Sequence, residues 1–101
     1  MSNPTIPSGT TVTATLTLDD DASGPALLII AHPSDSDSTG VAPGSSGSVS
    51  ITPVGFGILR VHVDMKEQSD SGQLTVEPGG VRKRVTGDHN EGFVVAVARG
   101  K

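Results

Sequence analysis

The chain has 101 residues, a formal net charge of −4, no cysteine and a hydrophobic content of 34%, in which only two residues are aromatic. Without cysteine there are no disulfides or thiolate metal sites, and a weakly acidic chain with so few rings lacks the basic surface and stacking platforms of nucleic-acid-binding proteins. The aliphatic residues, 12 Val, 6 Leu and 5 Ile, favour strands and are numerous enough for the core of one domain over residues 1–101.

The first predicted strand spans residues 11–18, where threonine alternates with Val12, Ala14, Leu16 and Leu18. Such a period of two is typical of an antiparallel strand with one face on a core and the other in water. An acidic turn over residues 19–25 follows and ends in Gly-Pro. Residues 26–31 are then apolar on both faces, which predicts a central strand, covered on both sides or at the most buried position of a sandwich.

Residues 33–48 consist mainly of Ser, Gly, Pro and Asp. This composition offers too little apolar surface to offset the entropy cost of ordering, so it predicts a long, flexible loop. A short strand around Val49 and Ile51 follows and ends at Pro53.

The second half repeats the alternation most clearly over residues 58–65, where Leu59, Val61 and Val63 point one way and the residues between them the other. Short strands are predicted around residues 74–76 and 81–85, and the last one, residues 93–98, is again apolar on both faces. Seven short strands without a helical period predict an all-β fold, an antiparallel β-sandwich, with a small β-barrel as the alternative.

Two acidic turns share the pattern Asp-x-Asp-x-Ser/Thr-Gly, and residues 88–92 form a looser third copy. Carboxylates on alternate residues of a tight turn can supply the oxygen ligands that calcium needs. The candidate metal ligands are Asp19, Asp21, Asp35 and Asp37. An EF-hand is excluded, because the twelfth positions counted from Asp19 and Asp35 are Ile30 and Ser46 rather than glutamate. Ordinary turns prefer the same residues, so turns without metal are the competing interpretation.

Residues 1–50 contain five Asp and no Lys or Arg, whereas the second half holds the basic cluster Arg82, Lys83 and Arg84. This cluster is interpreted as a solvated strand face or as a contact for the acidic loops, within or between subunits. The histidines lack zinc-ligand spacing and the Gly-x-Ser-x-Gly elbow of a hydrolase is absent. A hydrolase that uses His62 and Asp64 is therefore kept only as a third hypothesis.

We expect a non-enzymatic structural or protein-interaction module whose partner is another protein or a second copy of the chain. The alternative is a calcium-dependent, lectin-like ligand-binding domain, and calcium is the only cofactor considered. The start of the chain does not resemble a signal peptide and no apolar run is long enough to cross a membrane, which predicts no membrane partner and a cytoplasmic location. A leader removed from the natural protein would make it a secreted one instead.

Overall fold

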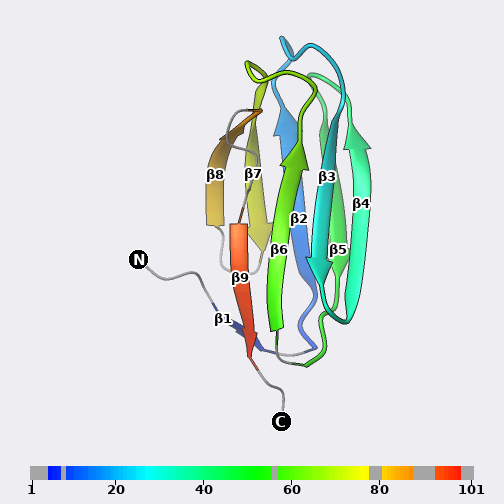
Figure 1. Ribbon diagram of the computed structural model, residues 1–101, viewed down its shortest axis with the longest axis vertical. Helices are drawn as coiled ribbons and strands as arrows, with labels where there is room; N and C mark the ends of the chain where they lie inside the picture. The colour runs from blue at the N-terminus through cyan, green and yellow to red at the C-terminus, as the bar shows by residue number, and fades with distance from the viewer. Residues whose placement is uncertain (1–4, 8, 56, 78–80, 88–92, 99–101) are drawn as a thin grey trace.

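The computed structural model describes the chain except for residues 1–4, 8, 56, 78–80, 88–92 and 99–101. In the described part the protein is all-β, and two sheets pack face to face (Figure 1). Its nine strands are β1 (Thr5–Pro7), β2 (Val12–Leu18), β3 (Ala26–His32), β4 (Asp35–Val41), β5 (Ser46–Ile51), β6 (Gly57–Asp64), β7 (Ser71–Glu77), β8 (Val81–Thr86) and β9 (Phe93–Ala98).

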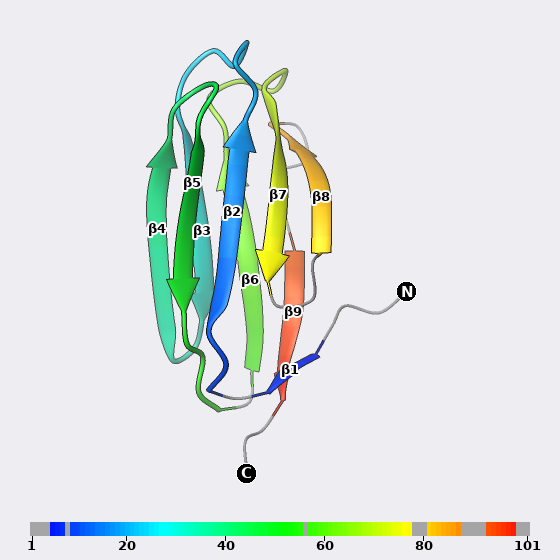
Figure 2. The same cartoon turned by 180° about the vertical axis from the view of Figure 1, so that it is seen from behind.

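One sheet has five strands in the order β1-β9-β6-β3-β4, and the other has four in the order β5-β2-β7-β8. Neighbouring strands pair antiparallel throughout, except that β1 runs parallel to β9. The five-stranded sheet faces the viewer in Figure 1 and the four-stranded sheet in Figure 2. The two sheets remain separate, so the predicted antiparallel β-sandwich is confirmed and the fold is not the closed barrel held as the alternative.

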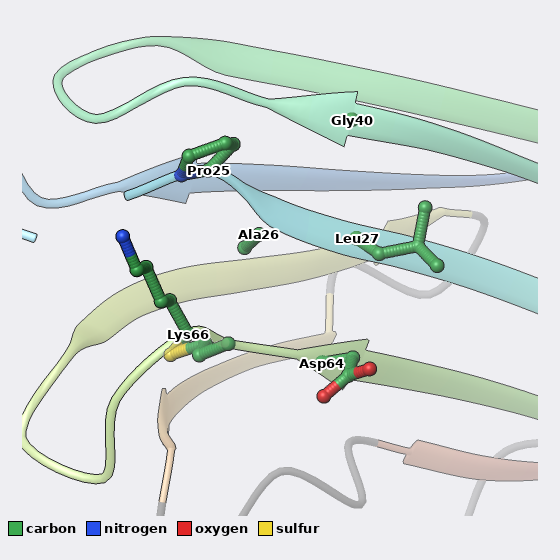
Figure 3. Close-up of a pocket in the computed structure, with 7 residues that line it drawn as sticks. Pro25, Ala26, Leu27, Gly40, Asp64 and Lys66 are labelled. Carbon is green, nitrogen blue, oxygen red and sulfur yellow. The ribbon is translucent and has the colours of Figure 1, made fainter. Parts of the chain in front are cut away.

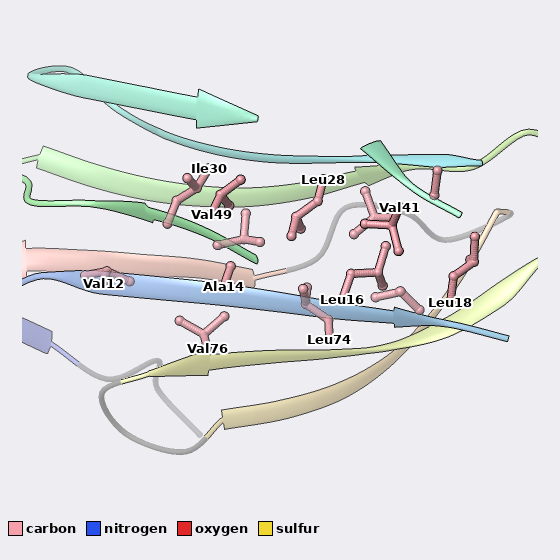
Figure 4. Packing of buried hydrophobic residues seen from close by; sticks show 14 of the residues in the cluster. Val12, Ala14, Leu16, Leu18, Leu28, Ile30, Val41, Val49, Leu74 and Val76 are labelled. Carbon is pink, nitrogen blue, oxygen red and sulfur yellow. The ribbon is translucent and has the colours of Figure 1, made fainter. Parts of the chain in front are cut away.

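Alternation along the strands places the core between the sheets, because every second side chain turns inward. In β2 the inward residues are completely buried while the threonines between them reach the surface. The described core is aliphatic, and Figure 4 shows part of it. It comprises Val12, Ala14, Leu16, Leu18, Ala26, Leu28, Ile30, Val41, Val49, Ile51, Leu59, Val61, Val63, Met65, Leu74, Val76 and Val85.

All seven predicted strands are present, and the structure adds β1 and β4. The prediction of a flexible loop over residues 33–48 is wrong, because this segment contains all of β4 and the start of β5. β4 pairs with β3 along its whole length, from Val41 opposite Ala26 to Asp35 opposite His32. Backbone pairing to a well-anchored neighbour thus organises a segment whose own composition disfavours a strand, as tertiary context often does.

A close approach of the two sheets fixes the edge formed by β4 and β5. Val41 is the buried residue of β4, and a Cβ placed on Gly47 in β5 would lie only 2.7 Å from its Cγ2 atom. Glycine at position 47 therefore allows β5 to pack closely against Val41 of β4.

Candidate functional site

The outer face of the four-stranded sheet carries a ladder of hydroxyl groups between β2 and β5. Four pairs of side chains, three within these strands and one just beyond their ends, are hydrogen-bonded across them, with oxygen–oxygen distances of 2.8–3.0 Å. We call these residues the hydroxyl face: Thr11 with Thr52, Thr13 with Ser50, Thr15 with Ser48, and Thr17 with Ser46. Because the hydroxyls satisfy one another and also meet water, this face gains little from a partner.

The outer face of the five-stranded sheet is different. We call it the β3–β6 face, and define it by the outward side chains of Leu27, Ile29 and Ala31 on β3 and of Ile58, Arg60, His62 and Asp64 on β6. The register sets three rows across the two strands, namely Leu27 beside Asp64, Ile29 beside His62, and Ala31 beside Arg60. Leu27 is 40% exposed and Ile58 is 43% exposed, and among the described large aliphatic residues only Val54 is more exposed.

Two hollows lie at opposite ends of the β3–β6 face. The first, of about 440 Å³, is lined by residues near the start of β3 and the end of β6, including Leu27, Asp64 and Lys66 (Figure 3). The second, of about 410 Å³, lies over Ala31 and is bordered by Ile58 and Arg60. In the second hollow the small side chain of Ala31 leaves room between larger neighbours.

A buried carboxylate fixes the loops beside the first hollow. Asp70 is only 4% exposed and accepts hydrogen bonds from the backbone N–H and hydroxyl of Ser23, at 2.9 and 2.8 Å, and from the backbone N–H of Glu67 at 3.2 Å. The bond from the Ser23 N–H contributes most to holding the pKa of Asp70 below its ordinary value of 3.8. Asp70 thus ties the β2–β3 loop to the β6–β7 loop.

A histidine fixes the other end of the face. The Ser34 backbone N–H donates to His32 Nδ1 at 3.1 Å, while the Ser34 Oγ lies 2.9 Å from the same nitrogen and accepts the Val54 N–H at 3.0 Å. Nδ1 is therefore the acceptor of the ring, which places the ring proton on Nε2. This Nε2 is buried and has no hydrogen-bond partner among the described residues.

Two exposed charges mark the β3–β6 face. Arg60 and Asp64 are both exposed and point outward from β6, with His62 between them. Neither has a hydrogen-bonded or ionic partner among the described residues, and four residues of strand separate them by about 13 Å, at roughly 3.3 Å per residue. They are therefore too far apart to pair with each other within one chain.

The structure does not bring the four predicted calcium ligands together. Asp19 and Asp21 follow the end of β2, whereas Asp35 and Asp37 belong to the start of β4, which lies at the opposite end of the sandwich (Figure 1). Asp35 and Asp37 each accept the N–H of the next residue. No group of three His, Asp or Glu side chains that could hold a metal occurs within the described residues, and the third acidic turn at 88–92, with His89, lies outside them.

Asp19 takes part in an interaction that joins the ends of three strands. Its carboxylate accepts a hydrogen bond of 2.7 Å from the Ser71 hydroxyl and forms an ion pair with Arg84, which also donates to Ser71 at 3.0 Å. The Ser71 hydroxyl, and after it Arg84, lowers the pKa of Asp19 from its ordinary value. One member of the basic cluster therefore contacts an acidic loop of its own chain.

The remaining predicted site residues lie apart. Lys83 is opposite Leu74 and Arg82 is opposite Thr75 in the four-stranded sheet, and both are exposed. His62 and Asp64 lie on the β3–β6 face, and no hydrogen bond between described residues joins His62 to a serine hydroxyl. Sequence reasoning missed Leu27, Ile29 and Ile58 as surface residues. For Leu27 and Ile29 the signal was present, because residues 26–31 were predicted to be apolar on both faces.

Comparison with known proteins leaves the function to be argued from this geometry, since no protein-family model, curated protein or solved structure matches the chain. The described residues also contain no helix that is long and apolar enough to span a membrane. The surface properties of the two sheets are therefore the main guide to function.

Proposed function

We propose that this protein is a non-enzymatic structural or protein-interaction module that binds another polypeptide through the β3–β6 face. The observation that carries the proposal is that β3 is apolar on both faces although the described chain covers only one of them. Leu28 and Ile30 are completely buried between the sheets, whereas Leu27 on the opposite face is 40% exposed. A second polypeptide would complete the burial that the sequence of β3 favours.

Rigidity of the surroundings supports a binding role. The face is built on paired strands, and the hydrogen bonds of Asp70 and His32 hold the loops at its two ends. A preorganised surface loses little conformational entropy when a partner binds.

Site-specific photo-crosslinking in the cells that produce the protein tests this proposal. A photoreactive amino acid at position 27 is expected to give covalent adducts with protein, because this position is exposed on the β3–β6 face. The matched control places the same group at Ser48, which is exposed on the hydroxyl face, and should give far fewer adducts. Protein adducts that are absent at position 27, or equally abundant at both positions, would refute the proposal.

A further inference from the structure

We infer that the partner of the β3–β6 face is a second copy of the same chain, bound face to face about a two-fold axis that passes over Ile29 and His62. The inference rests on the proposed function and identifies the partner. It starts from the register of β3 and β6, in which the row of Ile29 and His62 lies midway between the Leu27–Asp64 row and the Ala31–Arg60 row.

The two exposed charges are arranged as such an axis requires. In a two-fold interface each contact occurs twice, so that residue i of one copy meets residue j of the other and the reverse. An axis parallel to the sheet and perpendicular to the strands, above His62, places Arg60 of each copy over Asp64 of its partner. Two ion pairs then form from charges that have no partner among the described residues of one chain.

The two copies of the face also fit each other in shape when they are related by this two-fold axis. The Leu27–Asp64 row of one copy lies over the Ala31–Arg60 row of the other, so that the exposed Leu27 enters the hollow above Ala31. Ile58 lies one row beyond Arg60 and meets the end of the first hollow, next to Pro25 and Lys66. Each exposed aliphatic side chain of the face thus has a hollow to fill, which is the large-against-small packing of protein cores.

The size of the sheet sets the strength of the dimer. The strands β3 and β6 with their neighbours β4 and β9, at about 4.8 Å spacing and with about seven residues at about 3.3 Å each, give a face of roughly 440 Å² per copy. This is near the lower end of specific interfaces, where complexes are weak and reversible. We therefore expect dimerisation that depends on concentration rather than a permanent dimer.

Charge reversal at Arg60 and Asp64 tests the dimer, because combining the two reversals should restore the dimerisation that each one alone weakens. In analytical ultracentrifugation from about 1 μM to about 1 mM, Arg60→Asp and Asp64→Arg should each weaken dimerisation about tenfold or more, because like charges then face each other. An equimolar mixture of the two variants should form a heterodimer, and the double variant should again form a homodimer, since both arrangements recreate the two ion pairs. Arg82→Asp, an exposed reversal on the other sheet, is the control and should leave dimerisation unchanged. Circular dichroism verifies that each variant is folded.

The outcomes separate this inference from the proposed function. A wild-type protein that stays monomeric over this range, or a mixture of the two variants that does not associate, overturns the dimer. Dimerisation that is lost in Arg82→Asp and unaffected by Arg60→Asp also overturns it. If crosslinking at position 27 nevertheless captures a different protein, the proposed function stands without the dimer, and if it captures nothing, both fail.

Discussion

A pair of adjacent substitutions in β2 tests the sandwich itself. Leu16 is completely buried between the sheets, so Leu16→Ala removes three carbon atoms from the core, worth about 0.8 kcal/mol each, and leaves a cavity. We expect the free energy of unfolding to fall by about 3 kcal/mol, which corresponds to a decrease of roughly 15 °C in Tm for a domain of this size. Urea unfolding followed by circular dichroism measures the change.

Thr15→Ala is the matched control, because Thr15 precedes Leu16 and points to the opposite face. It loses one hydrogen bond of 2.9 Å to Ser48, but the Ser48 hydroxyl is exposed and can bind water instead. We expect a loss of about 1 kcal/mol or less. If Thr15→Ala destabilised the protein as much as Leu16→Ala, the assignment of inner and outer faces along β2 would be wrong, and the placement of the β3–β6 face would lose its basis.

Three further predictions concern the loops. Asp70→Asn should destabilise the protein at pH 7. Because the folded-state pKa of Asp70 is lowered, the stability that its charge contributes is present above the ordinary value of 3.8 and is lost as the pH falls below it. Urea unfolding at pH 7 and about pH 3 should therefore show the stabilities of the two proteins converging in acid, and a constant difference would contradict this origin. Gly87→Ala should lower Tm markedly, since its Cβ would lie 2.0 Å from the Glu67 carbonyl oxygen, whereas an unchanged Tm would show that this loop can move freely. Calcium at millimolar concentration should not raise Tm relative to a chelator, because the Asp19 carboxylate is already bound to Arg84 and Ser71; a rise with calcium and not with magnesium would restore the acidic turns as a metal site.

Local patterns were sufficient to predict most of the fold. Alternation in β2 and β6 reports directly which side chains face the core, because the period of a strand is two. The same information cannot reveal β4, whose polar residues form a strand only because β3 offers a complete backbone edge. Nor can it reveal the role of Asp70, whose partner Ser23 is 47 residues away in the chain.

The candidate site could likewise be predicted only in part from the sequence. The sequence places Arg60, His62 and Asp64 on one side of a strand, and the structure confirms that side as the outer one. Their relation to Leu27 and Ala31 depends on the register between β3 and β6, which is a property of the folded sheet. The apolar character of both faces of β3 was visible in the sequence, but whether this chain itself covers the second face could only be decided once the strands were assembled.

The distribution of polar groups explains why association through a face is favoured over association through an edge. An edge strand offers unpaired backbone groups to other chains, and natural proteins protect such edges with charge. β4 is one edge of the five-stranded sheet, and Asp35 and Asp37 are both exposed on it, so two copies of this edge would repel each other. Burying the hydroxyl face would remove water from groups that already satisfy one another and would release little apolar area. Among the described residues, the β3–β6 face is where exposed aliphatic side chains lie beside opposite charges that need a second chain to pair, and this combination supplies both the affinity and the orientation of a two-fold contact.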